Sequence, residues 1–121
     1  MPEGAVFSRA NLQLLILATM EALAEMDDHC RPTEAMKPLV MSAVQEELSG
    51  YVFRWLERTL RAGAYQQVGL ETTAAGLSWA IFGTAVDWSR MVERSPAEAT
   101  AAHIAALLTE GLSTVIGGLS G

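Results

Sequence analysis

The chain has 121 residues, of which 50% are hydrophobic and 18% are charged, so it is too apolar for intrinsic disorder and large enough for one hydrophobic core, not two. Eight Lys and Arg stand against fourteen Asp and Glu, and the formal net charge of −6 disfavours nonspecific binding to nucleic acid. We therefore expect a single domain over residues 1–121 that does not bind DNA by itself.

The first predicted helix covers about residues 8–28, with Ser8 as a candidate N-cap. It ends before Pro32, because a residue that precedes proline disfavours the α conformation. Its apolar residues recur at helical spacing and predict a mostly buried helix. They are Leu12, Leu15, Ile16, Leu23 and Met26, with Leu14 and Leu17 widening the apolar face.

The second predicted helix begins at about Pro38, after a short turn from Thr33, and ends at about Gly63. Its charged residues lie mostly away from one apolar stripe, as expected of an amphipathic helix. The stripe consists of Met41, Val44, Leu48, Val52, Trp55 and Thr59.

The third predicted helix, over about residues 71–93, is apolar on two opposite faces. We assign one face to the core of the chain: Leu77, Ile81, Ala85, Trp88 and Val92. The opposite face carries Ala75, Gly76, Trp79, Phe82, Gly83 and Val86. A helix that is apolar on two sides must be covered on two sides. In a domain of this size we expect the second cover to be a bound ligand or another copy of the chain. The reverse assignment, in which the Leu77 face meets the second cover and the Trp79 face meets the core, is the alternative.

The fourth predicted helix starts at Ser95-Pro96-Ala97-Glu98, where Ser is the N-cap and Glu completes a capping box. It runs to about Ile116, before Gly117-Gly118. Its apolar residues span an arc of roughly 180°, wider than the ~100° that one packing contact requires. The sequence therefore predicts an all-α fold of four main helices. The last two helices have more apolar surface than packing within one chain requires.

Nothing in the sequence predicts a secretion signal or a membrane span. The start of the chain lacks the basic residues of a signal peptide, and the longest apolar run, residues 14–18, is far shorter than the ~20 residues of a span. The single cysteine, Cys30, excludes an intrachain disulfide and a multi-thiolate zinc site. We expect a cytoplasmic protein without a membrane partner.

Three segments between residues 55 and 112 carry a resemblance to a known family. They are residues 55–63 (WLERTLRAG), residues 76–88 (GLSWAIFGTAVDW) and residues 102–112 (AHIAALLTEGL), the last two joined through the cap at Ser95-Pro96. Together they resemble the C-terminal half of TetR-family (tetracycline-repressor-like) transcriptional regulators, from about Leu39 onward. In that family the C-terminal domain binds a small, often hydrophobic effector and dimerises through its last two helices.

The resemblance implies a homodimer in which the last two helices of each copy form a four-helix interface. The residues expected at this interface are Trp79, Phe82, Gly83, Val86, Leu108, Gly111, Leu112 and Val115. The family binds its operator through an N-terminal helix-turn-helix module, and no residues precede Met1 that would form one. The chain is thus expected to be either a fragment of a longer regulator, reaching DNA only through that missing module, or a stand-alone relative.

Four residues are candidates for an effector pocket, because methionine and aromatic side chains adapt to varied apolar ligands. They are Met20, Met41, Phe53 and Trp55. Met41 and Trp55 also occupy the predicted core stripe, so ordinary core packing is the alternative for this set.

No pattern in the sequence supports catalysis or a metal site. Asp27, Asp28, His29 and Cys30 are of metal-ligand type, but neighbours on a helix point in different directions and only His103 adds a second histidine. Arg54, Arg58 and Arg61 share a helix face with Glu57 and are typical of a solvated surface. We expect an effector-binding and dimerisation domain that is not an enzyme and has no cofactor. A structural helical dimer without a small-molecule ligand is the alternative.

Overall fold

The computed structural model describes residues 8–29, 35–61, 65–66 and 69–117, and the side chains of residues 8–26, 35–59 and 69–112. Within these ranges the fold is all-α apart from one pair of two-residue strands. The elements in chain order are α1 (Arg9–His29), α2 (Lys37–Arg61), β1 (Tyr65–Gln66), α3 (Leu70–Ser89), α4 (Ala97–Val115) and β2 (Ile116–Gly117).

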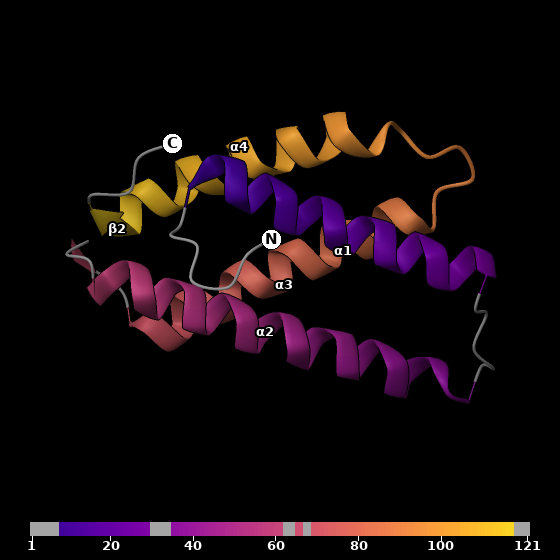
Figure 1. Ribbon diagram of the computed structural model, residues 1–121, viewed down its shortest axis with the longest axis horizontal. Coiled ribbons are helices and arrows are strands. Elements are labelled where there is room, and N and C mark those ends of the chain that lie inside the picture. The colour runs from indigo at the N-terminus through magenta and orange to yellow at the C-terminus, as the bar shows by residue number, and fades with distance from the viewer. Residues whose placement is uncertain (1–7, 30–34, 62–64, 67–68, 118–121) are drawn as a thin grey trace.

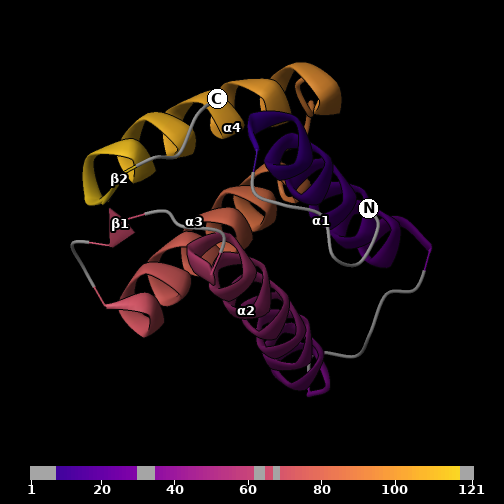
Figure 2. The ribbon, with the colours of Figure 1, turned by 60° about the vertical axis from the view of Figure 1, so that its left-hand side comes forward.

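The four helices alternate in direction and pack in series rather than as a closed ring (Figure 1). α1 packs against both α4 and α3, and α3 packs in turn against α2. Figure 2 shows α3 as the central helix, between α2 on one side and α1 and α4 on the other. None of the described helices is long and apolar enough to cross a membrane.

Buried side chains at helical spacing form one core that involves all four helices. On α1 they are Leu12, Ile16, Met20 and Leu23, at intervals of three or four residues. The prediction of a mostly buried first helix is confirmed only in part, because Leu14, expected to widen its apolar face, is 50% exposed. The core of the other helices comprises Leu48, Val52, Trp55 and Leu56 of α2, Ala74, Leu77, Ile81, Phe82, Ala85, Val86 and Trp88 of α3, and Ala101, Ile104, Ala105 and Leu112 of α4.

The start of α1 is capped as the sequence predicts. The backbone N–H of Asn11 donates to the Ser8 side-chain oxygen at 3.1 Å, which satisfies one of the amide groups that a helix start leaves without a partner. Near the other end of the chain, α4 begins at Ala97, and the Ser95 hydroxyl forms a hydrogen bond with the Thr100 hydroxyl at 2.7 Å.

The third helix ends four residues earlier than predicted, at Ser89 instead of Glu93. The Arg94 guanidinium folds back and donates from Nε and Nη2 to the Ser89 carbonyl at 3.1 and 3.0 Å. Arg94 also lies over the Trp88 ring at 5.4 Å, and the Trp88 indole N–H donates to the Ser95 carbonyl at 2.8 Å. Val92 was predicted in the core face of this helix, but it lies in the turn and is fully exposed.

The expectation that only a ligand or a second copy covers the other face of α3 is wrong for part of that face. α2 packs against α3, and Phe82 and Val86 are each only 9% exposed within the single chain. The physical reason is the serial packing, which gives the central helix neighbours on two sides. Trp79, by contrast, remains 59% exposed.

A two-residue antiparallel pairing joins the segment before α3 to the segment after α4. Tyr65 pairs with Gly117 and Gln66 with Ile116. The sequence does not predict this pairing, because two residues are too few to show the alternation of a strand. It places β1, which precedes α3 in the chain, beside the end of α4 (Figure 2).

Candidate functional site

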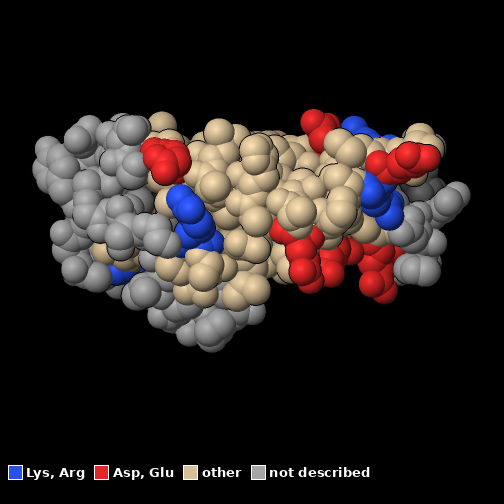
Figure 3. Space-filling model, turned by 90° about the horizontal axis from the view of Figure 1, so that it is seen from above, with Lys and Arg blue, Asp and Glu red and all other residues tan. Residues whose placement is uncertain are grey.

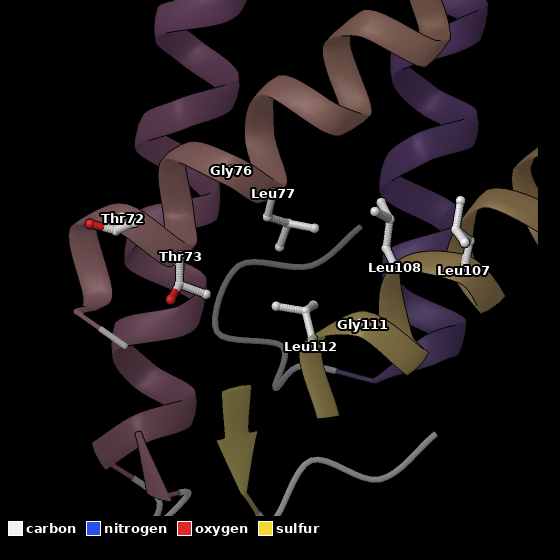
Figure 4. A pocket seen from close by; sticks show the side chains of 8 residues that line it. All are labelled: Thr72, Thr73, Gly76, Leu77, Leu107, Leu108, Gly111 and Leu112. Carbon is white, nitrogen blue, oxygen red and sulfur yellow. The ribbon is translucent and has the colours of Figure 1, made fainter. Parts of the chain in front are cut away.

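An apolar groove lies between the first half of α3 and the second half of α4. It has a volume of about 280 Å³, and we call it the α3–α4 groove. Figure 4 shows that Leu77 of α3 and Leu108 and Leu112 of α4 point into the space between the two helices. The complete lining is Thr72, Thr73, Gly76, Leu77, Leu107, Leu108, Gly111 and Leu112.

Glycines on both helices keep the α3–α4 groove open. A Cβ added at Gly76 or at Gly111 would meet no atom within 4 Å, so neither glycine is needed to relieve crowding inside the single chain. Leu107, which also lines the groove, projects from α4 with 63% of its surface exposed. Trp79 of α3 is exposed too, but it lines a pocket on the α2 side of that helix. The face with the α3–α4 groove therefore carries both an apolar hollow and an exposed leucine.

Charges are sparse along this part of the chain. Between Glu98 and Glu110, α4 has no Lys, Arg, Asp or Glu. Figure 3, which shows the molecule from above, has a broad area without charged residues, with Lys, Arg, Asp and Glu on both sides of it. The Arg9 guanidinium and the Glu110 carboxylate lie 3.7 Å apart at the end where α1 begins and α4 finishes. Both side chains are exposed enough for water to screen the pair, so its contribution to stability is small.

The predicted dimer residues are only partly brought together on this face. Leu108, Gly111 and Leu112 line the α3–α4 groove. Trp79 and Gly83 are exposed on α3. Phe82 and Val86 belong to the core, and Val115 is in α4 beyond the described side chains.

None of the three pockets described between the helices brings the predicted effector residues together. Met20 and Trp55 are completely buried in the core, and Phe53 packs against that core from its edge. Met41 alone among them lines a described pocket, which lies between α2 and α3. The spacing of methionine and aromatic residues did not distinguish core from pocket, because both require the same side chains.

The structure also shows groove residues that the sequence reasoning missed. Thr72, Thr73 and Leu107 line the α3–α4 groove but were not predicted as site residues. Leu107 could have been predicted from the sequence, since it lies at the outer edge of the wide apolar arc of α4. The two threonines gave none, because a threonine at the start of a helix is commonplace.

No group of three His, Cys, Asp or Glu that could hold a metal ion occurs among the described residues. Cys30 and the side chains of Asp27, Asp28 and His29 lie outside the description, and His103 is exposed on α4.

Comparisons with known proteins identify no relative: no family model, no curated protein and no solved structure matches the chain.

Proposed function

We propose that this chain is the dimerisation and effector-binding part of a TetR-like transcriptional regulator, and that it pairs with a second copy through α3 and α4. The observation that carries the proposal is the α3–α4 groove, an apolar hollow with an exposed leucine, Leu107, in its lining. The resemblance of residues 76–88 and 102–112 to the family supports it independently.

We expect a second copy to suit this face, because the face carries both a projection and a hollow. In a two-fold contact the same patch meets itself, so a patch with both a projection and a hollow can fill both at once. Here Leu107 is the projection, and the open space at Gly76 and Gly111 is the hollow. Burial of exposed apolar surface contributes roughly 25 cal/mol for each Å² removed from water.

The effector part of the proposal concerns a small hydrophobic molecule that changes how the two copies sit relative to each other. Such a ligand would act only through differential affinity for two arrangements of the dimer. DNA binding would belong to a module outside this chain.

Leu107→Glu tests the dimer, with Leu14→Glu as its matched control. Both leucines are exposed in the single chain, at 63% and 50%, so neither substitution disturbs the core. Leu107→Glu places a charge in the proposed contact, and we expect it to weaken dimerisation at least tenfold, since an unpaired charge is costly to bury. Sedimentation equilibrium measures this, and equal dimerisation of both variants would refute the contact.

The burial of Met20 and Trp55 favours one alternative, a structural helical dimer without a small-molecule ligand. These side chains fill the positions where the sequence placed an effector. A thermal-shift screen with neutral hydrophobic compounds separates the two functions, because only an effector-binding domain is stabilised by such compounds. A screen without any stabilising compound would support the structural dimer.

A further inference from the structure

The α3–α4 groove has no charged residue among its described lining, unlike the two other hollows described between the helices. Its lining is leucine, glycine and threonine, and the largely buried Leu77 and Leu112 point into it (Figure 4). The hollow between α1 and α2 is lined by Glu47 and Arg54, and the pocket between α2 and α3 by Glu46. A ligand that covers an unpaired charge removes it from water, which is costly. A neutral hydrophobic molecule is therefore expected to prefer the α3–α4 groove.

The volume of this groove exceeds what one leucine side chain fills. The groove encloses about 280 Å³, whereas a closed apolar cavity of about 150 Å³ is enough for benzene. The side chain of leucine is smaller than benzene. In the proposed dimer the partner's Leu107 therefore leaves about half of the groove or more unfilled. A molecule the size of naphthalene fills the space better and makes more apolar contacts in it.

Leu107 is both part of the groove lining and the exposed projection beside it. A two-fold contact seats this projection in the hollow of the other copy. That hollow lies at Gly76 and Gly111, where an added Cβ would meet no atom within 4 Å. A ligand that lies against the same two glycines occupies the same space. A bound ligand and a seated leucine therefore exclude each other.

From this shared space we infer that the α3–α4 groove is itself the effector site, and that its ligand is a neutral, apolar molecule about the size of two fused rings that displaces the partner's Leu107. The inference rests on the proposed function, because it names the site and the action of the effector. The two arrangements of the dimer then differ in whether the leucine or the ligand fills the groove. Since linkage is reciprocal, the effector loosens the dimer, and pairing weakens effector binding by the same factor.

Three naphthyl probes test the ligand class at pH 7. They are the neutral 2-naphthalenemethanol, the anion 2-naphthoate and the cation 2-naphthylmethylammonium. Titration calorimetry on the full chain, at a protein concentration below the dimerisation range, measures their affinities for the free groove. We expect the neutral probe to bind at least tenfold more tightly than either ion, because the described lining offers no opposite charge to pair with.

Sedimentation equilibrium with the neutral probe tests the competition. Each dimer needs two free grooves, so its dissociation constant rises with the square of the factor by which the probe depletes them. At a free probe concentration of about ten times its Kd, we expect the dimer dissociation constant to rise about a hundredfold. The affinity of the probe should in turn fall as the protein concentration passes through the dimerisation range.

Variants assign both effects to the groove. Gly76→Leu adds a side chain in the open space and should weaken the binding of the neutral probe at least tenfold. Ala75→Leu adds the same side chain at an exposed neighbour outside the lining and should leave the affinity of the probe unchanged. Leu107→Ala removes the projection from a position that is exposed in the single chain. In this variant the affinity of the probe should no longer fall as the protein concentration rises.

Several results would overturn the inference. One is a dimer whose dissociation constant stays the same while the neutral probe is bound, and another is equal affinity of the three probes. A third is full affinity of the neutral probe for Gly76→Leu. A chain that is monomeric without any probe contradicts the proposed dimer instead, and the preference for the neutral probe and its loss in Gly76→Leu then still decide where the ligand binds.

Discussion

Arg94→Met tests how the turn between α3 and α4 is held. Arg94 donates two N–H groups to the Ser89 carbonyl, at the end of α3, and its guanidinium lies 5.4 Å from the centre of the Trp88 ring. Methionine retains the apolar stem but loses the charge and both donors. The substitution therefore removes the hydrogen bonds and the cation–π contact while most of the packing stays.

The expected loss of stability combines two contributions. Hydrogen bonds from a charged donor contribute about 1.5–3 kcal/mol, and an exposed cation–π contact contributes about 0.5–1 kcal/mol. Arg94 is partly exposed, so water screens both and takes over some of the lost hydrogen bonding. We expect the free energy of unfolding to fall by about 1–2 kcal/mol, which lowers Tm by roughly 3–10 °C in a domain of this size.

Urea unfolding followed by circular dichroism measures this loss at a fixed protein concentration, so that any self-association is equal in all samples. Arg90→Met is the matched control, because Arg90 is an exposed cation in the same turn. Equal stability of the two variants, or a change below about 0.3 kcal/mol for Arg94→Met, would refute the role of Arg94 as the clamp of this turn.

Two further substitutions separate core from surface. Trp55→Ala opens a cavity at a completely buried position and should lower the free energy of unfolding by about 3–5 kcal/mol. A loss below about 1 kcal/mol in urea unfolding would contradict the placement of Trp55 in the core. Gly83→Ala adds a Cβ that meets no atom within 4 Å, so in the single chain it should gain about 0.5–1 kcal/mol of helix stability. A loss in the same assay would instead show that a partner packs closely on Gly83.

The helices were predictable because their buried faces repeat at helical intervals. Leu12, Ile16 and Leu23 on α1 and Val52 and Trp55 on α2 are buried as their spacing predicts. The start of α1 was readable from Ser8, since its side chain caps the helix by a local contact. Local contacts are the part of a fold that a short stretch of sequence encodes by itself.

The end of α3 was not predictable in the same way. The apolar pattern continues through Met91 and Val92, and nothing within those residues marks a stop. The helix ends at Ser89, where Arg94 and Trp88 hold the turn through contacts with Ser89 and Ser95. These contacts form only when the chain folds back, so periodicity cannot show them.

The order of helix packing lay equally beyond the sequence. Two apolar faces on α3 predicted two covers, but not that α2 provides one of them and buries Phe82. The pocket between α2 and α3 was not predicted, because Gln45, which lines it, is a polar residue outside the apolar stripe of this helix and yet is buried. Gln45 donates to Ser49 within α2, and the contact of Ser49 with Ser78 of α3 appears only in three dimensions.

The mass of the unaltered chain in solution tests the central claim most directly. Sedimentation equilibrium over a wide concentration range should give a species of twice 13.0 kDa that dissociates only on dilution. A mass of 13.0 kDa at every concentration would contradict the account, because the exposed Leu107 and the α3–α4 groove would then face water in the working protein.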